Sequence, residues 1–374
     1  MELRIERVTS RRDLRNFIHL PFDIYQDNPY WVPPLLLDEY ASLRKDKNPA
    51  FDFCQAEYWL AYRDGKIVGR IAGIINPKAN EKWGHSYARF GWVDFVEDFA
   101  VAEVLFAAVI DWAKEHGMTG LQGPMGFTDF DKEGMLVEGF NELGTLPMIY
   151  NHAYYPEYLE RLGFSKEVDW IEFEIKCPRE IPEKVSRVSQ ASLKRQGLEV
   201  AKIKNRRELA KKYGRQIFEI VNEAYADLYG TTPVTERQMD FYIDLYLGFV
   251  NVRYVPIIVD ATGKAVGFGL AMPSLSRGLQ RSRGRIFPIG WWHLWRALAR
   301  PVSGDMYLVA VRKQYQNKGL TAILMTEILQ NAIADGMVSA ESSGELETNQ
   351  SVQQIWRHYD VRQHKRRRAY KFVF

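Results

Sequence analysis

The stretch MYLVAVRKQYQNKGLTAILMTEILQNAIADGM, which spans residues 306–337, decides the fold of this chain. The residues up to Val311 are almost all apolar, as in a buried strand. A polar turn follows and ends at Gly319. The remaining residues repeat apolar side chains at helical spacing up to Gly336, a residue type that often ends helices. The stretch therefore predicts a strand, a turn and a helix in direct succession.

The turn has the composition of an anion site. It carries three cations, Arg312, Lys313 and Lys318. A helix that starts at a glycine such as Gly319 presents backbone N–H groups and the positive end of its dipole, and both suit phosphate oxygens. A solvated turn has a similar composition, so the residues alone leave both interpretations open.

A second copy of this pattern lies in the first half of the chain. Residues 101–118 (VAEVLFAAVIDWAKEHGM) align without gaps with residues 320–337 (LTAILMTEILQNAIADGM). A predicted β-hairpin precedes each helix, with GKIVG at 65–69 and GKAVG at 263–267. The repeat predicts two copies of one unit that mixes strands and helices.

The length of 374 residues accommodates two such units. We predict a mixed α/β fold of the α+β type, with a first domain at residues 1–178 and a second at 198–374. Residues 179–197 are polar and lack a sheet pattern, so we take them as a linker that is partly helical.

Composition sets the class of protein. With 46% hydrophobic and 26% charged residues, the chain is globular, and its net charge of +3 gives no reason to expect a specific nucleic-acid partner. Two cysteines, Cys54 and Cys177, form neither a disulfide framework nor a zinc site by themselves. The chain shows no signal peptide and no apolar run of about 18 residues. We predict a cytoplasmic protein without a metal.

The first copy lacks the features of the anion site. Glu97 aligns with Gln316, and Ala100 aligns with Gly319. The carboxylates of Glu97 and Asp98 would repel a diphosphate. We therefore expect one cofactor site, in the second domain, with the first domain on the acceptor side.

The segment Gln316–Thr321 (QNKGLT) resembles the Q/R-x-x-G-x-G/A pyrophosphate loop of the GNAT N-acyltransferase superfamily, although Thr321 replaces the usual final Gly or Ala. The resemblance implies two tandem GNAT (acyl-CoA N-acyltransferase) domains. Further stretches, among them NPYWVP at 28–33, GMLVEGF at 134–140 and FPIGW at 287–291, resemble more narrowly the bacterial ceramide synthase-like (YghO-like) family. Members of that family are taken to transfer a fatty acyl group from a thioester to a long-chain base.

The resemblance also implies the cofactor site. The thioester would be acyl-CoA, either acetyl-CoA or long-chain acyl-CoA, or an acyl carrier protein, and it would bind along the fourth strand, the turn and the following helix. Trp356 stands where many GNAT enzymes have a tyrosine near the sulfur. We expect Trp356 to pack against the pantetheine arm or in the core. The residues assigned to this site are Val309, Ala310, Val311, Arg312, Gln316, Asn317, Lys318, Gly319, Leu320, Thr321 and Trp356.

The catalytic candidates follow the predicted fifth strand. Glu347 is the candidate base, because a carboxylate near an entering ammonium can accept its proton; an ion pair is the alternative. Asn349 begins the short helix, and Tyr359 is the candidate acid, since tryptophan cannot protonate a thiolate. Neither cysteine lies in a motif typical of a nucleophile, so we expect direct attack by the amine.

An acid-rich loop in the first domain is the candidate acceptor site, because carboxylates beside aromatic side chains suit a cationic head group. The alternative for the acidic loop is a solvated loop without a ligand. The alternative for His152 is a structural, hydrogen-bonded residue. The candidates are Asp129, Asp131, Glu138, Tyr150, Asn151, His152 and Tyr155.

An insertion at 265–304 contains no acidic residue but holds arginines and three tryptophans, Trp291, Trp292 and Trp295. Its composition is typical of a helix at an anionic lipid surface, which would place the protein at the inner face of the membrane. A core helix with a basic flank is the alternative. The run Lys365–Arg368 is a solvated segment or a contact for phosphate or lipid.

The leading hypothesis is acyl transfer to a lipid amine, such as a sphingoid base. Two alternatives stay open. Enzymes of the Fem family use aminoacyl-tRNA, which would account for the arginines through phosphate contacts. A non-catalytic protein that binds acyl-CoA or lipid would account for the missing tyrosine.

Overall fold

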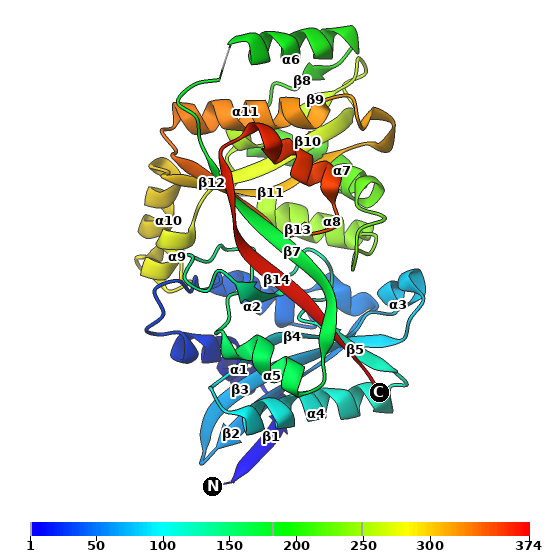
Figure 1. The fold of residues 1–374 in the computed structure, drawn as a ribbon, viewed down its shortest axis with the longest axis vertical. Helices are drawn as coiled ribbons and strands as arrows, with labels where there is room; N and C mark the ends of the chain where they lie inside the picture. Colours follow the sequence, from blue (N-terminus) through cyan, green and yellow to red (C-terminus); the bar gives the residue numbers. More distant parts are fainter. Residues whose placement is uncertain (1, 182, 248–249) are drawn as a thin grey trace.

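A computed structural model describes residues 2–181, 183–247 and 250–374. Figure 1 shows the two halves of the chain as two lobes, connected by two long strands that cross from one lobe to the other. The predicted α+β class is confirmed.

The first lobe contains the repeat unit of the N-terminal half. Its strands are β1 (Leu3–Arg7), β2 (Gln55–Arg63), β3 (Lys66–Ile75), β4 (Tyr87–Phe95), β5 (Gly120–Gly123), β6 (Met135–Glu138) and β7 (Ser165–Lys176). Its helices are α1 (Arg11–Ile24), α2 (Leu36–Leu43), η1 (Pro49–Asp52), α3 (Pro77–Trp83), α4 (Phe99–Glu115) and α5 (Tyr154–Arg161).

The second lobe follows the predicted linker, which forms helix α6 (Glu183–Arg195) as its polar composition allows. The strands are β8 (Glu199–Val200), β9 (Ile257–Val259), β10 (Ala265–Pro273), β11 (Ser303–Val311), β12 (Ser339–Ser342), β13 (Glu345–Leu346) and β14 (Val361–Val373). The helices are α7 (Arg206–Ala224), α8 (Glu236–Tyr242), η2 (Ile243–Leu247), η3 (Val252–Tyr254), α9 (Ser276–Ser282), α10 (Gly290–Ala299), η4 (Lys313–Tyr315), α11 (Leu320–Ala334), α12 (Gln350–Gln353) and η5 (Gln354–His358).

The strands of both lobes form one continuous sheet in the order β1-β2-β3-β4-β5-β14-β7-β12-β11-β10-β9-β8. The C-terminal strand β14 lies between β5 and β7, where Tyr370 pairs with Gly123. Strand β7 continues into the second lobe, where Lys176 pairs with Ser339 of β12. The lobes therefore exchange strands across the predicted boundary at residue 178, whose exact position stays a prediction.

The two repeated helices cover their sheets in the same way. Leu105 of α4 and Ile328 of α11 are buried against the hairpin strands. A Cβ at Gly69 would lie 2.7 Å from Leu105 Cδ1, and a Cβ at Gly269 would lie 2.9 Å from Ile328 Cδ1. Only glycine lets each helix approach this closely. Over the described residues, no helix has both the length and the apolar character needed to cross a bilayer.

Candidate active site

The turn before α11 has the backbone of an anion cradle. Asn317 and Gly319 adopt φ of 60° and 77°, so the chain passes through two left-handed residues before the helix begins. No side chain caps the start of α11. A Cβ built on Gly319 meets no atom within 4 Å, so the space beside the first N–H groups is open. This arrangement of open space and unsatisfied donors fits a diphosphate.

We expected all three cations of the turn to add charge to the anion site, but two of them contact carboxylates. The Arg312 guanidinium donates to Glu223 at 3.0 Å and to Glu219 at 3.1 Å, both on α7. The Lys313 ammonium lies 3.2 Å from a carboxylate oxygen of Asp227. Arg312 therefore anchors the end of β11 to α7 and offers no free charge, whereas Lys318 is exposed beside the turn.

Strands β11 and β12 separate next to this turn. Their parallel pairing ends where Met306 meets Ser342, while β11 continues to Val311 beside β10. The Tyr225 hydroxyl donates to the Val309 carbonyl at 3.0 Å. The two strands thus form a gap lined by the backbone in which the resemblance places the thioester. The neighbouring Ala310 side chain is buried in the core.

The remaining predicted cofactor residues surround the turn. The Gln316 side-chain amide donates to the Val311 carbonyl at 3.2 Å and so ties the turn to the strand. Leu320 is buried under the start of α11, and Thr321 lies in the first helical turn.

A cavity of about 1030 Å³ adjoins the gap and extends between the lobes. Its lining is mostly apolar and comes from α2, α7, η2, β10, α10, β11 and α11. Its volume is at the upper end of the range for ligand pockets. A long, flexible apolar group fits such a space.

Glu345 is the acid that faces this cavity near the gap. One carboxylate oxygen accepts from the Trp356 indole N–H at 2.8 Å, and the other has no hydrogen-bond partner among the described residues. Burial raises the pKa of Glu345 to about 7. A carboxyl group with this pKa can exchange a proton near neutral pH.

The predicted base Glu347 has a different role. Its carboxylate lies 2.5 Å from the Lys166 ammonium and 3.0 Å from the Arg366 guanidinium. It does not line the cavity. Both of its oxygens are held in ion pairs, as the alternative proposed, so the role of Glu347 as a catalytic base stays a prediction that this geometry does not favour.

Asn349 and Trp356 both line the cavity, as expected for residues near the acyl group. Tyr359 does not line it; its ring packs against Trp356 with the ring centroids 6.1 Å apart. Burial raises the pKa of Tyr359 above its usual value. This position is unfavourable for the acid role that we predicted for Tyr359.

The cavity has an acidic end in the first lobe. Asp129 and Asp131 line it as predicted, together with Asp38 and Glu133. Burial raises the pKa of Asp38 to about 7, that of Asp131 to about 6 and that of Glu133 to about 8. The buried Arg89 guanidinium partly opposes this effect for Asp131 and Glu133, and Lys132 does so for Asp38. A cationic ligand would stabilise the ionised carboxylates here.

Two other predicted acceptor residues lie outside the cavity. Glu138 is paired with Arg366, with an N–O distance of 3.2 Å, on a largely exposed side chain. The Tyr150 hydroxyl donates to the Phe140 carbonyl at 2.8 Å and accepts from the Asn28 amide at 3.1 Å. Both residues stabilise the loop, and the cavity does not support their assignment to substrate binding, which stays a prediction.

The rest of that group is structural as well. The Asn151 side chain accepts from the Leu136 N–H at 2.7 Å and donates to the Leu136 carbonyl at 3.0 Å. His152 stacks on Tyr25 with the ring centroids 4.8 Å apart. Tyr155 is fully buried in the first lobe. None of the three lines the cavity, so the cavity does not support their assignment to substrate binding either, and it stays a prediction.

The sequence contained partial signals for the residues that we missed. Glu345 lies two positions before Glu347, and the sequence cannot tell which of the two faces the ligand. Glu133 belongs to the acidic loop already singled out. Asp38 and Tyr225 carry no local signal, because distant segments bring them to the cavity.

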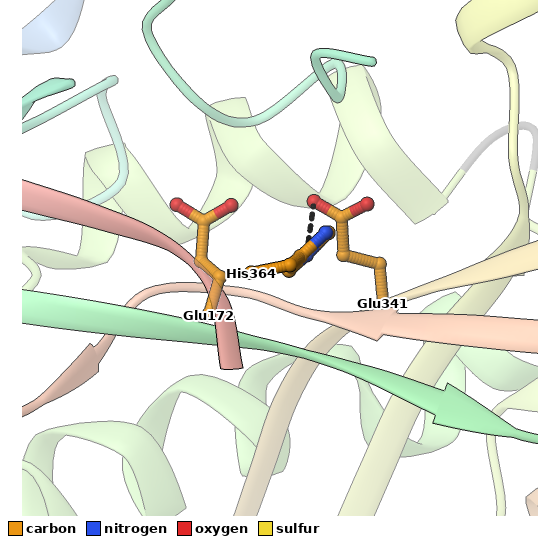
Figure 2. Close-up of side chains that lie close together, drawn as sticks. All are labelled: Glu172, Glu341 and His364. Carbon is orange, nitrogen blue, oxygen red and sulfur yellow. Dashed lines mark ion pairs between the residues drawn. The ribbon is translucent and has the colours of Figure 1, made fainter. Parts of the chain in front are cut away.

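Glu172, Glu341 and His364 form a further polar cluster where the exchanged strands meet, and Figure 2 shows His364 between the two carboxylates. Lys365 contacts Glu341 and lies 3.8 Å from Glu172, and Arg367 also binds Glu172. Because these cations already balance the carboxylates, we read the cluster as a buried ion-pair network and assign no metal to it.

Comparisons with known proteins identify relatives over nearly the whole chain. No family model matches the chain. Protein YghO of Escherichia coli (strain K12) is 27% identical over 373 residues, which cover 97% of this chain and 93% of that protein. Bacterial ceramide synthase of Caulobacter vibrioides (strain NA1000 / CB15N) is 28% identical over 382 residues, with coverages of 99% and 97%.

Among solved structures, a tandem GNAT protein from the clavulanic acid biosynthesis pathway superposes with a TM-score of 0.57. The superposition covers 100% of this chain and 98% of that chain at 14% identity, which shows the fold alone. The resemblance inferred from the motifs is thus confirmed. The chain is a homologue of YghO and of bacterial ceramide synthase, and it has the tandem GNAT fold.

Proposed function

We propose that this protein is an N-acyltransferase that moves a fatty acyl group from acyl-CoA to the amine of a lipid such as a sphingoid base. One observation carries the proposal: a large apolar cavity connects the gap beside β11 with a group of carboxylates. An acetyl group would leave most of this space empty. A fatty chain fills it, and a carboxylate end suits an ammonium group.

The acyl-CoA site is formed by the second lobe. The open N–H groups at Gly319 and the exposed Lys318 would hold the diphosphate. The thioester supplies an activated carbonyl carbon and a thiol leaving group. Backbone N–H groups near Val309 would stabilise charge on the carbonyl oxygen, as donors of this kind do in acyl transfer.

Glu345 prepares the acceptor amine in this proposal. An amine attacks only when it is neutral, so its ammonium form has to lose a proton first. The unpaired carboxylate oxygen of Glu345 would accept that proton, and the hydrogen bond from Trp356 orients the other oxygen. The acidic end formed by Asp38, Asp129, Asp131 and Glu133 would bind the cationic head group, which in turn would stabilise the ionised carboxylates.

The chemistry of the relatives is consistent with this proposal. One homologue is named a bacterial ceramide synthase, and ceramides are N-acylated long-chain bases. The open turn at Gly319 also favours acyl-CoA over the aminoacyl-tRNA of the Fem-like alternative, because free N–H groups at a helix start suit a diphosphate.

The test is to incubate the purified chain with palmitoyl-CoA and sphinganine. We expect release of free thiol and formation of the N-acyl product by mass spectrometry, with lower rates for acetyl-CoA. Binding of acyl-CoA without thiol release for any lipid amine would contradict the enzymatic proposal and favour a binding protein. Activity that is sensitive to ribonuclease would favour the tRNA-dependent alternative.

A further inference from the structure

We propose that the exposed residues of 277–300, which we call the α9–α10 surface, bind a membrane that contains anionic lipids. Apolar and aromatic side chains gather here although they face solvent. Phe287 is 77% exposed and Ile289 is 64% exposed. The rings of Trp292 and Trp295 stack with centroids 4.9 Å apart, and both side chains are exposed. Side chains of this kind partition to the interface between water and lipid.

The charges of the α9–α10 surface indicate that the membrane it binds carries anionic lipids. The same segment carries six exposed arginines: Arg277, Arg281, Arg283, Arg285, Arg296 and Arg300. None of them forms an ion pair with a carboxylate in the part of the chain that the structure describes. Residues 265–304 contain no acidic residue at all. Unpaired arginines next to tryptophans complement an anionic lipid surface.

The α9–α10 surface is also held firmly on the molecule. A Cβ at Gly278 would lie 3.1 Å from the His293 carbonyl oxygen, so α9 and α10 are packed closely. The Gln280 side-chain amide donates to the carbonyls of Pro29 and Trp31 in the first lobe at 2.8 and 2.9 Å. The exposed apolar side chains thus belong to a fixed element, and their exposure is not that of a frayed end.

The α9–α10 surface leads into the cavity. Trp291 and Trp295 on α10 line the cavity and are also about half exposed, at 52% and 53%. Leu37 of α2 also lines the cavity and is exposed. A lipid could therefore pass from the bilayer into the cavity without crossing water. This second step rests on the proposed function, whereas membrane binding does not.

The experiment compares the full chain on vesicles of phosphatidylcholine alone and of phosphatidylcholine with phosphatidylglycerol in equal parts. We expect flotation only with the anionic vesicles, and weaker binding at high salt. Arg281→Gln and Arg296→Gln should each reduce the partition coefficient about fivefold. The triple variant Phe287→Ser/Ile289→Ser/Trp292→Ser should remove binding, because these side chains supply the apolar contact.

Matched controls use exposed positions elsewhere. Val373→Ser removes an exposed valine at the end of β14, and Lys202→Gln/Lys204→Gln removes two exposed charges between β8 and α7. Both should bind vesicles as the natural chain does. No flotation of the natural chain with anionic vesicles would overturn the proposal. So would binding that depends on the arginines but not on the apolar side chains, since that result describes a polyanion site without lipid insertion.

A second readout separates this proposal from the proposed function. The triple variant should keep the acylation rate of a water-soluble amine, because none of its three positions lines the cavity. It should lose acylation of sphinganine that is embedded in vesicles. Loss of both rates in a folded variant would contradict the role of the α9–α10 surface as an entrance. An inactive natural chain that still binds vesicles would contradict only the enzymatic proposal.

Discussion

The two copies of the long helix begin in opposite ways. At the start of α4, the Asp98 side chain accepts from the Ala100 N–H at 3.1 Å and pairs with Arg63 at 2.7 Å. At the start of α11, no side chain caps the helix and Gly319 leaves open space. The first lobe thus supplies its own anion, whereas the second leaves the same place open.

The strands that precede these helices, β4 and β11, also differ in how far side chains cover their backbone. In the first lobe, the Phe95 N–H donates to the Tyr155 hydroxyl at 2.8 Å, and the Tyr154 hydroxyl donates to the Phe95 carbonyl at 2.7 Å. In the second lobe, the backbone near Val309 faces the cavity. In the first copy two tyrosine hydroxyls hold the N–H and the carbonyl of Phe95, whereas in the second copy the Tyr225 hydroxyl holds the Val309 carbonyl and the strand borders the cavity. The comparison teaches that one fold can leave this place open in one copy and close it with its own side chains in the other.

The largest expected effect concerns Glu345, the proposed base in the second lobe. Glu345→Gln should lower the acyl-transfer rate by about a hundredfold to ten-thousandfold, because glutamine cannot accept a proton. The natural enzyme should also gain activity as the pH rises through about 7, since Glu345 is protonated below its raised pKa. Rates measured from acidic to alkaline pH should show this rise, and the variant should lack it.

Glu347→Gln is the matched control for that prediction. It removes a carboxylate held by Lys166 and Arg366, so it should reduce thermal stability while changing the rate by only a few fold. A larger loss of rate for Glu347→Gln than for Glu345→Gln would reverse the assignment of the base.

The next prediction tests the open helix start. Gly319→Trp should raise the dissociation constant of acyl-CoA at least about tenfold, because the side chain enters the space where the diphosphate would lie. Gly336→Trp is the control, since Gly336 has a φ of 76° and equally open surroundings at the other end of α11. Calorimetric titration with acyl-CoA measures both. Equal affinities of the two variants for acyl-CoA would show that the turn at Gly319 does not bind the diphosphate.

A smaller effect is expected in the first lobe, where Tyr154 and Tyr155 bond the backbone of Phe95. Tyr155→Phe removes the oxygen that accepts from the buried Phe95 N–H, so the free energy of unfolding should fall by about 1–3 kcal/mol. Chemical denaturation measures this change, and the acylation rate of the folded protein should stay the same. A large loss of rate at unchanged stability would mean that the first lobe takes part in the chemistry through Tyr155.

The smallest effect concerns the cap of α4. Asp98→Ala should lower the free energy of unfolding by about 1 kcal/mol, because it removes a helix cap and an ion pair that is about two-thirds buried. Titration of the variant with acyl-CoA should still give one site per chain. A second binding site would show that Asp98 alone keeps the first lobe from binding acyl-CoA.

The sequence predicted those parts of the molecule that depend on neighbouring residues. The strand, turn and helix around Gly319, the hairpins and the terminal glycines all follow local patterns, and the structure contains them. The internal repeat extended these patterns to the first half. It also identified Asp98 as an obstacle to diphosphate, although its role as a helix cap emerged only from the structure.

Long-range pairing decided what the sequence could not predict. Glu345 faces the cavity and Glu347 the ion pairs because β13 pairs with β7, where Glu345 lies opposite Ile171. Arg312 turns away from the cradle because the glutamates of α7 lie beside it. Neither partner can be inferred from the residues adjacent in sequence, so the sequence predicted the backbone of the candidate site but not which side chains face the cavity.

The exchange of β7 and β14 has a consequence for biosynthesis. During translation, the N-terminal lobe emerges first, yet β5 and β7 lack the strand that separates them until residues 361–373 have left the ribosome. Unpaired strand edges favour misassociation with other chains. A nascent molecule therefore depends on its final strand to become complete, and a premature stop before that strand would disable both lobes at once.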